Sequence, residues 1–218
     1  MKYAFYISGR SGRLFKFLKQ AAPEFLNGGG VKLVVSDLVV EEKLQFALTE
    51  YGITTEVIDD KKLDGDRKYK NRMISDFILE KLVEHGIDYC ISFGSHILSG
   101  DLLKQYENKL INFHPAILPM FPGVKSIDQA VDHGNVLLVG NTAHFIDSGM
   151  DTGPIIMQSV IPLKAFRDTK DYDIVLDLQI EMLNKLLKVL EGNRLHFVNG
   201  YPVIEGADYN RNMIFPCF

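Results

Sequence analysis

Apolar and polar residues alternate in blocks along the first half of the chain, and the blocks have the lengths of strands and helices. Short apolar runs predict strands at residues 3–7, 31–35, 55–58 and 89–93. Segments with helical spacing predict helices at residues 14–20, 41–51 and 69–85, and the charged stretch 59–68 predicts a loop. The run at 89–93 lacks strict alternation, as a strand buried in a parallel sheet does. This βαβ rhythm predicts an α/β fold, doubly wound, with a mostly parallel sheet and helices on both faces.

The second half adds two further strands, at 109–114 and 136–146, and a long amphipathic helix over 171–190. We expect the apolar stripe of that helix to cover the sheet, and Glu191-Gly192-Asn193 to end the helix. With 218 residues, 46% of them hydrophobic, the chain is long enough for one sizeable core. We expect one catalytic domain over residues 1–200, followed by a C-terminal tail, residues 201–218, to which we assign no role.

Polar residues gather where the strand 109–114 ends. Side chains alternate along a strand, so Asn112 and His114 face the same way, and Pro115 keeps the strand from continuing. Open α/β sheets bind ligands just outside the carboxyl ends of their strands. Asn112 and His114 are therefore candidate site residues.

A second polar group follows the strand 136–146. His144 lies near its end, and Gly149, Gly153 and Pro154 impose a loop that carries Asp151. If the two strands are neighbours, Asp151 can meet His114. Each residue also has a structural explanation when taken alone, since Asn112 and Asp151 can cap turns and a histidine can be a satisfied structural group.

An Asn, a His and an Asp at one place suit acyl transfer. The amide can donate to a developing oxyanion, the imidazole can polarise a carbonyl or handle a proton, and the carboxylate can orient the imidazole. The chain has no Gly-x-Ser-x-Gly nucleophile motif, and Cys90 lies within an apolar strand. Direct attack by an amine on a bound acyl donor therefore fits better than covalent catalysis.

The junction after the first strand is rich in glycine and arginine. A glycine-rich turn that opens a helix exposes backbone N–H groups that suit a phosphate, and arginines add positive charge. A tight turn also needs glycines, so anion binding and simple turn chemistry both remain open. The third glycine of a dinucleotide-binding motif is absent. The candidate substrate-binding residues here are Gly9, Arg10, Ser11, Gly12 and Arg13.

The amino-acid composition limits the classes of molecule that we expect the protein to bind. The 24 Lys and Arg residues against 28 Asp and Glu give a net charge of −4, without an electrostatic footprint for nucleic acid. The two cysteines, Cys90 and Cys217, have no metal-ligand spacing, so we expect neither a disulfide nor a metal. No apolar run has the length of a signal peptide core or a membrane span, which predicts a cytoplasmic protein that acts on a small molecule. The sequence says little about oligomeric state.

The segments 112–119 (Asn-Phe-His-Pro-Ala-Ile-Leu-Pro) and 150–156 (Met-Asp-Thr-Gly-Pro-Ile-Ile), with Pro122-Gly123 and His144 between them, resemble the folate-dependent formyltransferases. The resemblance covers most of residues 1 to about 192 and is most specific between Phe93 and Ile156. It implies formyl transfer from 10-formyltetrahydrofolate to an amine, with Asn112, His114 and Asp151 as the catalytic set and His144 in support. By the same resemblance, the folate would bind to Phe93, Ser95, His96, Ile97, Leu98, Phe145, Ile146 and Asp147.

The resemblance leaves the amine acceptor open, although a phosphorylated or nucleotide-linked amine would fit. The branch that formylates glycinamide ribonucleotide in purine synthesis has a Gly-Ser-Asn loop where this chain has Ser11-Gly12-Arg13, and a glutamate where this chain has Leu178, one turn from Glu181. Nucleotide-sugar N-formyltransferases resemble the same motif. Methionyl-tRNA formyltransferases and formyltetrahydrofolate hydrolases carry further domains. A folate-binding protein without catalysis is the alternative from another class, and the intact Asn112, His114 and Asp151 argue against it.

Overall fold

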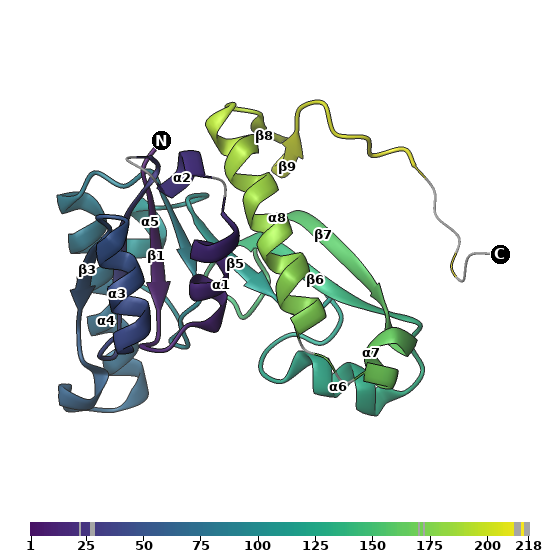
Figure 1. Ribbon diagram of the computed structural model, residues 1–218, viewed down its shortest axis with the longest axis horizontal. Helices are drawn as coiled ribbons and strands as arrows, with labels where there is room; N and C mark the ends of the chain where they lie inside the picture. The colour runs from purple at the N-terminus through teal and green to yellow at the C-terminus, as the bar shows by residue number, and fades with distance from the viewer. Residues whose placement is uncertain (22, 27–28, 170, 172, 212–214, 216–218) are drawn as a thin grey trace. The chain divides into compact units, whose positions relative to one another are not determined.

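The structure is a computed structural model, and it describes residues 1–218 except 22, 27, 28, 170, 172, 212–214 and 216–218. Its chain divides into two units (Figure 1). The first unit comprises residues 1–113 and 144–153, and the second comprises residues 114–143 and 154–218. We describe each unit by itself.

Parallel strands form the sheet of the first unit. They are β1 (Tyr3–Ile7), β2 (Val31–Ser36), β3 (Thr54–Val57), β4 (Tyr89–Ser92) and β5 (Leu110–His114). Strand β1 pairs with β2 and β4, β2 also pairs with β3, and β4 also pairs with β5, all in parallel. The predicted strands lie within one residue of these bounds. Four of them are mostly buried apolar runs, whereas β3 at the edge of the sheet is partly exposed.

Two more strands, β6 (Leu138–Phe145) and β7 (Ile155–Pro162), complete the sheet. Its hydrogen-bonded order is β3-β2-β1-β4-β5-β6-β7. The predicted fold class, doubly wound and mostly parallel, is confirmed. The sequence did not predict the strand at 155–162, because Gly153-Pro154 and the residues after them resemble a single loop motif.

Helices cover both faces of the first unit's sheet. The ring of Phe5 on β1 lies 5.2 Å from the ring of Phe17 on α1 (Gly12–Gln20), which runs beside α3 (Glu42–Glu50) in Figure 1. The next side chain along β1, Tyr6, points to the other face. There it joins a buried cluster with Ile74 and Ile78 of α4 (Arg67–Glu84) and Leu102 of α5 (Asp101–Gln105). The short helices α2 (Pro23–Leu26) and η1 (Asp60–Lys62) lie in the connections.

The second unit is built around its longest helix, α8 (Asp173–Glu191), which contacts β7. Most of the predicted apolar stripe is buried, including Leu183, Leu186 and Leu187, whereas Ile174, Leu176 and Leu178 near its start are half-buried. The other elements of the unit are α6 (Ser126–His133), α7 (Leu163–Thr169), β8 (Leu195–Val198) and β9 (Tyr201–Ile204). The strands β8 and β9 form an antiparallel hairpin, so regular structure continues past the predicted boundary at residue 200.

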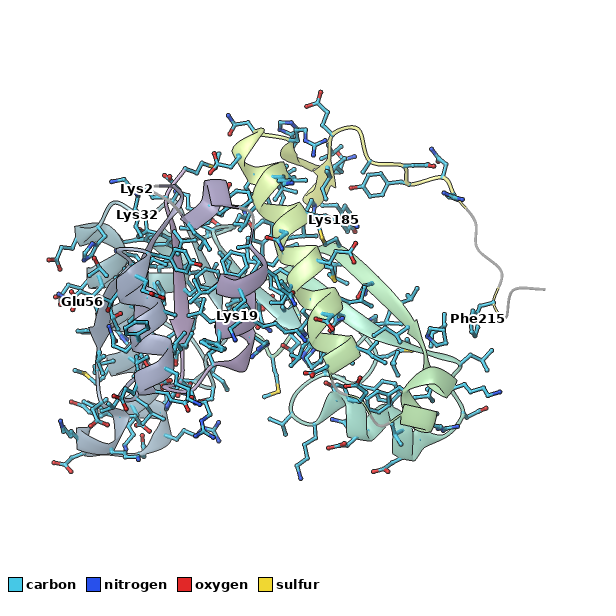
Figure 2. All side chains as sticks on the ribbon, in the orientation of Figure 1. Lys2, Lys19, Lys32, Glu56, Lys185 and Phe215 are labelled. Carbon is cyan, nitrogen blue, oxygen red and sulfur yellow. The ribbon has the colours of Figure 1, made fainter. Side chains whose placement is uncertain are left out.

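The surface carries charges of both signs. Figure 2 shows Lys2, Lys19 and Glu56 on the first unit, and Lys185 on α8 pairs with Glu181 at 2.6 Å. None of the described helices is long and apolar enough to cross a membrane. Cys90 is fully buried on β4, whereas Cys217 lies outside the described residues.

Candidate active site

Three of the predicted site residues lie together in the first unit. Asn112 comes from β5 and His144 from the end of β6, and Asp151 follows on the next loop. The Asn112 Nδ2 lies 3.2 Å from His144 Nε2 and 3.5 Å from Asp151 Oδ1. His144 Nε2 and Asp151 Oδ1 are 3.6 Å apart. An amide, an imidazole and a carboxylate therefore share one small volume beyond the strand ends.

The hydrogen bonds of His144 define its tautomer. Its Nδ1 lies 2.8 Å from the carbonyl oxygen of Phe145, which can only accept, so Nδ1 carries a proton. Its Nε2 faces the NH₂ group of Asn112, which can only donate, so Nε2 is the acceptor. A neutral imidazole with the proton on Nδ1 satisfies both contacts. In this state Asn112, rather than His144, donates to Asp151.

The loop that carries Asp151 is shaped by its own side chains. Asp147 Oδ1 accepts from the backbone N–H of Gly149 at 2.9 Å and from the Thr152 hydroxyl at 2.7 Å, which closes an Asx turn. Asp151 itself has a φ of +55°, in the left-handed region that Asp and Asn tolerate better than most residues. A Cβ at Gly153 would collide with the carbonyl oxygen of Phe145. The loop sequence thus places the carboxylate beside Asn112.

A cavity of ≈ 150 Å³ opens next to these side chains. Its lining includes all three residues and parts of the segments predicted to bind the folate, and it consists of Ser92, Gly94, His96, Ile97, Leu98, Asn112, His144, Ile146, Asp147, Gly149, Met150 and Asp151. Five predicted folate-binding residues are therefore at the cavity: His96, Ile97, Leu98, Ile146 and Asp147.

The other predicted folate-binding residues have different surroundings. The Phe93 ring packs between those of Phe5 and Phe113, at 5.6 and 6.2 Å, and Phe145 is buried. The Ser95 N–H donates to Ser8 at 2.9 Å. Their folate-binding role stays a prediction.

His114 is the first residue of the second unit. It is buried at the end of β5, and its Nε2 lies 2.9 Å from the carbonyl oxygen of Phe121. Because a carbonyl oxygen only accepts, Nε2 carries a proton. The predicted meeting of His114 with Asp151 stays a prediction.

The junction Ser8–Arg13 is explained in part by turn chemistry. Gly9 has a φ of +63° and packs against Leu38, and Ser11 caps α1 by accepting from the N–H of Leu14 at 3.2 Å. Arg10 is exposed and pairs with Glu41 at 3.3 Å. Gly12 has open space around it. The substrate-binding roles of Gly9, Arg10, Ser11, Gly12 and Arg13 stay predictions.

Arg13 is turned inward. Its guanidinium donates to the carbonyl oxygens of Phe113 at 3.2 Å and Phe93 at 3.3 Å, and stacks on the Phe93 ring at 4.6 Å. Burial lowers its pKa to about 10. Arg13 therefore ties the ends of β4 and β5 together.

Two residues of α8 were compared with the glutamate that binds the amine substrate in the glycinamide ribonucleotide branch, and they have different surroundings. Leu178 packs against the buried cluster of the second unit that includes Ile161 and Phe166. Glu181 is exposed and pairs with Lys185. Leu178 thus has a packing role, and a carboxylate is available one turn further on.

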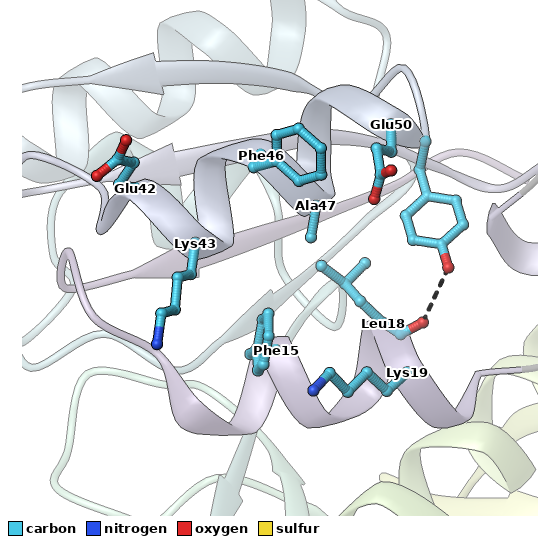
Figure 3. Close-up of a pocket in the computed structure, with 9 residues that line it drawn as sticks. Phe15, Leu18, Lys19, Glu42, Lys43, Phe46, Ala47 and Glu50 are labelled. Atoms are coloured by element: carbon cyan, nitrogen blue, oxygen red, sulfur yellow. Dashed lines mark hydrogen bonds between the residues drawn. The ribbon is translucent and has the colours of Figure 1, made fainter.

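A second cavity in the first unit, of ≈ 510 Å³, lies between α1 and α3 (Figure 3). Phe15 and Leu18 of α1 face Phe46 and Ala47 of α3 across it. Its lining combines these apolar side chains with the charged residues Lys19, Glu42, Lys43 and Glu50. It shares no residue with the cavity beside Asn112.

A buried polar network behind the first cavity was not predicted from the sequence. It contains Tyr6, Ser8 and Asp37. The available signal was the same as for Asn112, because Ser8 follows β1 and Asp37 follows β2 at their carboxyl ends.

Comparison with known proteins gives a consistent family. The model of the family described as "Formyl transferase" matches residues 1–183. The phosphoribosylglycinamide formyltransferase of Bacillus subtilis (strain 168) is 41% identical over 99 residues, which are 44% of this chain and 50% of that protein. The human trifunctional purine biosynthetic protein adenosine-3 is 32% identical over 165 residues, which are 75% of this chain and 15% of that protein. The matches thus span half or less of these two relatives.

A solved structure extends the likeness over nearly the whole chain. The crystal structure of phosphoribosylglycinamide formyltransferase from Anaplasma phagocytophilum superposes with a TM-score of 0.75 at 25% identity. It covers 95% of this chain and 96% of that one.

Proposed function

This chain belongs to the formyl transferase family, and on that premise we propose that it transfers a formyl group from 10-formyltetrahydrofolate to the amine of a small acceptor. The observation that carries the proposal is the contact of Asn112 with both His144 and Asp151 beside a cavity. Formyl transfer needs a hydrogen-bond donor that stabilises the oxyanion and a group that accepts the proton of the amine. It does not need a covalent nucleophile.

In the proposed reaction the acceptor amine attacks the formyl carbon, and the carbonyl π electrons move to oxygen. The Asn112 contact with Asp151 is 3.5 Å, the limit of a hydrogen bond, so this N–H can turn to the oxyanion. Asp151 takes the proton that the attacking nitrogen loses. The oxyanion then collapses and the bond from carbon to the folate nitrogen breaks. Asp151 returns its proton to that nitrogen, so the carboxylate is regenerated.

The remaining residues have supporting roles in this proposal. His144 holds Asn112 through its Nε2. For His114 we propose the role in the catalytic set that the resemblance implies, which is stabilisation of the oxyanion. The cavity of ≈ 150 Å³ is smaller than the ~300–1,000 Å³ of pockets that enclose a whole drug-sized ligand. We assign it to the reacting end of the folate, with His96, Ile97, Leu98 and Ile146 in its wall.

The acceptor we propose to test first is glycinamide ribonucleotide, because the relatives are named for that substrate class. Its phosphate would bind at the junction Gly9–Arg13. A nucleotide-linked amino sugar is the second acceptor class, because nucleotide-sugar N-formyltransferases resemble the same motif. Arg13 is committed to backbone carbonyls here, so it does not favour either class.

The test is to incubate the protein and 10-formyltetrahydrofolate with glycinamide ribonucleotide, with nucleotide-linked amino sugars, or with no acceptor. Release of tetrahydrofolate is followed together with the formylated amine. We expect release to depend on one acceptor class. Release without any acceptor would instead identify a hydrolase, and binding of folate without turnover would identify a folate-binding protein.

A further inference from the structure

The wall of the active-site cavity includes the segment 93–98, here called the donor loop. Its members Gly94, His96, Ile97 and Leu98 line the cavity that Asn112 and Asp151 also line. The donor loop follows β4 and is neither strand nor helix. Its first residue, Phe93, still donates its backbone N–H to the carbonyl oxygen of Tyr6 at 2.7 Å, but the residues after it are outside the repeating hydrogen bonds of a strand or helix. Its position therefore depends on the side chains behind it.

Those side chains form a chain of hydrogen bonds with a defined direction. Asp37 Oδ2 accepts from the Tyr6 hydroxyl at 2.5 Å and from the Ser8 hydroxyl at 2.8 Å. The single hydroxyl proton of Ser8 is thus used, so Ser8 Oγ can only accept from Ser95. The N–H and the hydroxyl of Ser95 both lie 2.9 Å from that oxygen. Ser95 therefore reaches Asp37 through Ser8.

Packing and a second set of polar contacts act on the same loop. The ring of Tyr6 occupies the space that a Cβ at residue 94 would need. The Nδ1 of His96 lies 2.7 Å from Asn71 Oδ1 on α4, and its Nε2 is 3.6 Å from Asp60 and 3.9 Å from Asp37. The loop is thus held from β1, β2 and α4 at once.

We propose that Tyr6, Ser8 and Asp37 are positioning residues that hold the donor loop in the conformation that binds the folate. This inference rests on the proposed function, because it assigns the loop's cavity to the formyl donor. Asp37 has a side chain only 1% exposed, and its Oδ1 has no hydrogen-bond partner among the described residues. Burying a carboxylate in this way costs free energy, and the hydrogen bonds that Asp37 accepts from Tyr6 and Ser8 are what connect it to the loop.

The variants Tyr6→Phe and Tyr106→Phe form a matched pair. Both tyrosines belong to the same buried cluster, and both donate a hydroxyl hydrogen bond. Tyr106 donates to the carbonyl oxygen of Ile87, before β4 begins, whereas the donor loop follows the end of β4. Ser8→Ala removes the link itself. None of the three substituted residues lines the cavity beside Asn112, so kcat should be preserved.

The experiment measures KM for 10-formyltetrahydrofolate, KM for the acceptor, kcat, and the Kd of tetrahydrofolate by direct titration. We expect Tyr6→Phe and Ser8→Ala to raise the donor KM and the folate Kd by roughly 2- to 10-fold, as loss of one hydrogen bond does. Tyr106→Phe should leave both constants unchanged, and kcat and the acceptor KM should stay within about 2-fold in all variants. In the double variant, with both Tyr6→Phe and Ser8→Ala, the donor KM and the folate Kd should rise by less than the product of the two single-variant fold-changes, because both residues act through Asp37.

The inference would be overturned if the donor KM and the folate Kd of Tyr6→Phe and Ser8→Ala were equal to those of Tyr106→Phe. A fall in kcat at unchanged donor KM and folate Kd would also overturn it. A wild-type protein that binds tetrahydrofolate but transfers no formyl group would overturn the proposed function instead, and the folate Kd values would still decide the role of the loop.

Discussion

At the scale of single residues, Gly153 lies where the loop of Asp151 passes closest to the backbone of β6. Gly153→Ala places a Cβ against the carbonyl oxygen of Phe145, which is backbone and cannot move aside cheaply. We expect a loss of about 1–3 kcal/mol in the free energy of unfolding, measured in urea. Gly12→Ala is the matched control, because nothing lies within 4 Å of its Cβ position. Equal stability of the two variants would contradict the described loop geometry.

The buried thiol of Cys90 makes the free energy of unfolding depend on pH. Burial raises the pKa of its thiol from 9.0 to about 12, so the folded protein keeps a proton that the unfolded chain releases. The resulting stability is fully present below pH 9 and is lost as the pH rises from 9 through about 12. Unfolding free energies across this range should fall less steeply in Cys90→Ala. The Cys90 thiolate also helps to raise the pKa of Tyr106, after burial of that hydroxyl, and this smaller effect is lost in the variant in the same direction. Identical slopes would therefore refute the burial of the thiol.

Residues at the site differ in how far the sequence could predict them. Asn112, His144 and Asp151 were found because two strands end in polar residues, and the structure brings these three together. The tautomer of His144 and the inward turn of Arg13 were not predictable. Both depend on backbone carbonyls, of Phe145 in one case and of Phe93 and Phe113 in the other, whose positions follow from tertiary structure.

At the scale of elements, long and periodic segments were predicted and short ones were missed. Strand β1 was predicted at its observed bounds, Tyr3–Ile7. Helix α6 was missed because no side chain caps its start, where Lys125 has a φ of +56°. The hairpin of β8 and β9 was missed because most of β8 is exposed and lacks apolar alternation.

Helix α8 provides the test at this scale. Leu187→Ala removes a fully buried side chain from the predicted apolar stripe, and we expect a loss of about 2–5 kcal/mol in unfolding free energy. Glu181→Gln on the exposed face removes only the pairing with Lys185, and surface pairs of this kind contribute at most ~1 kcal/mol. The free energy of unfolding of both variants is measured in denaturant. A larger loss in Glu181→Gln than in Leu187→Ala would contradict the described orientation of the helix.

At the scale of the whole molecule, the chain divides into two units, and the single catalytic domain over residues 1–200 stays a prediction. The division was invisible in the sequence because the chain passes from the first unit to the second and back between Phe113 and His144. The family match over residues 1–183 includes parts of both units. The predicted domain boundary, the tail's role and the cytoplasmic location stay predictions.

The central claim is that Asp151, held beside Asn112, moves the proton in formyl transfer, and Asp151→Asn tests it most directly. Asparagine tolerates the φ of +55° at this position and keeps the side chain's shape, so folding and tetrahydrofolate binding should be preserved. The measurement is kcat for acceptor-dependent release of tetrahydrofolate, with the acceptor that the panel identifies. We predict a decrease on the order of 10²-fold or more, because general-base assistance is lost. An unchanged kcat in a folded variant that still binds folate would contradict the account.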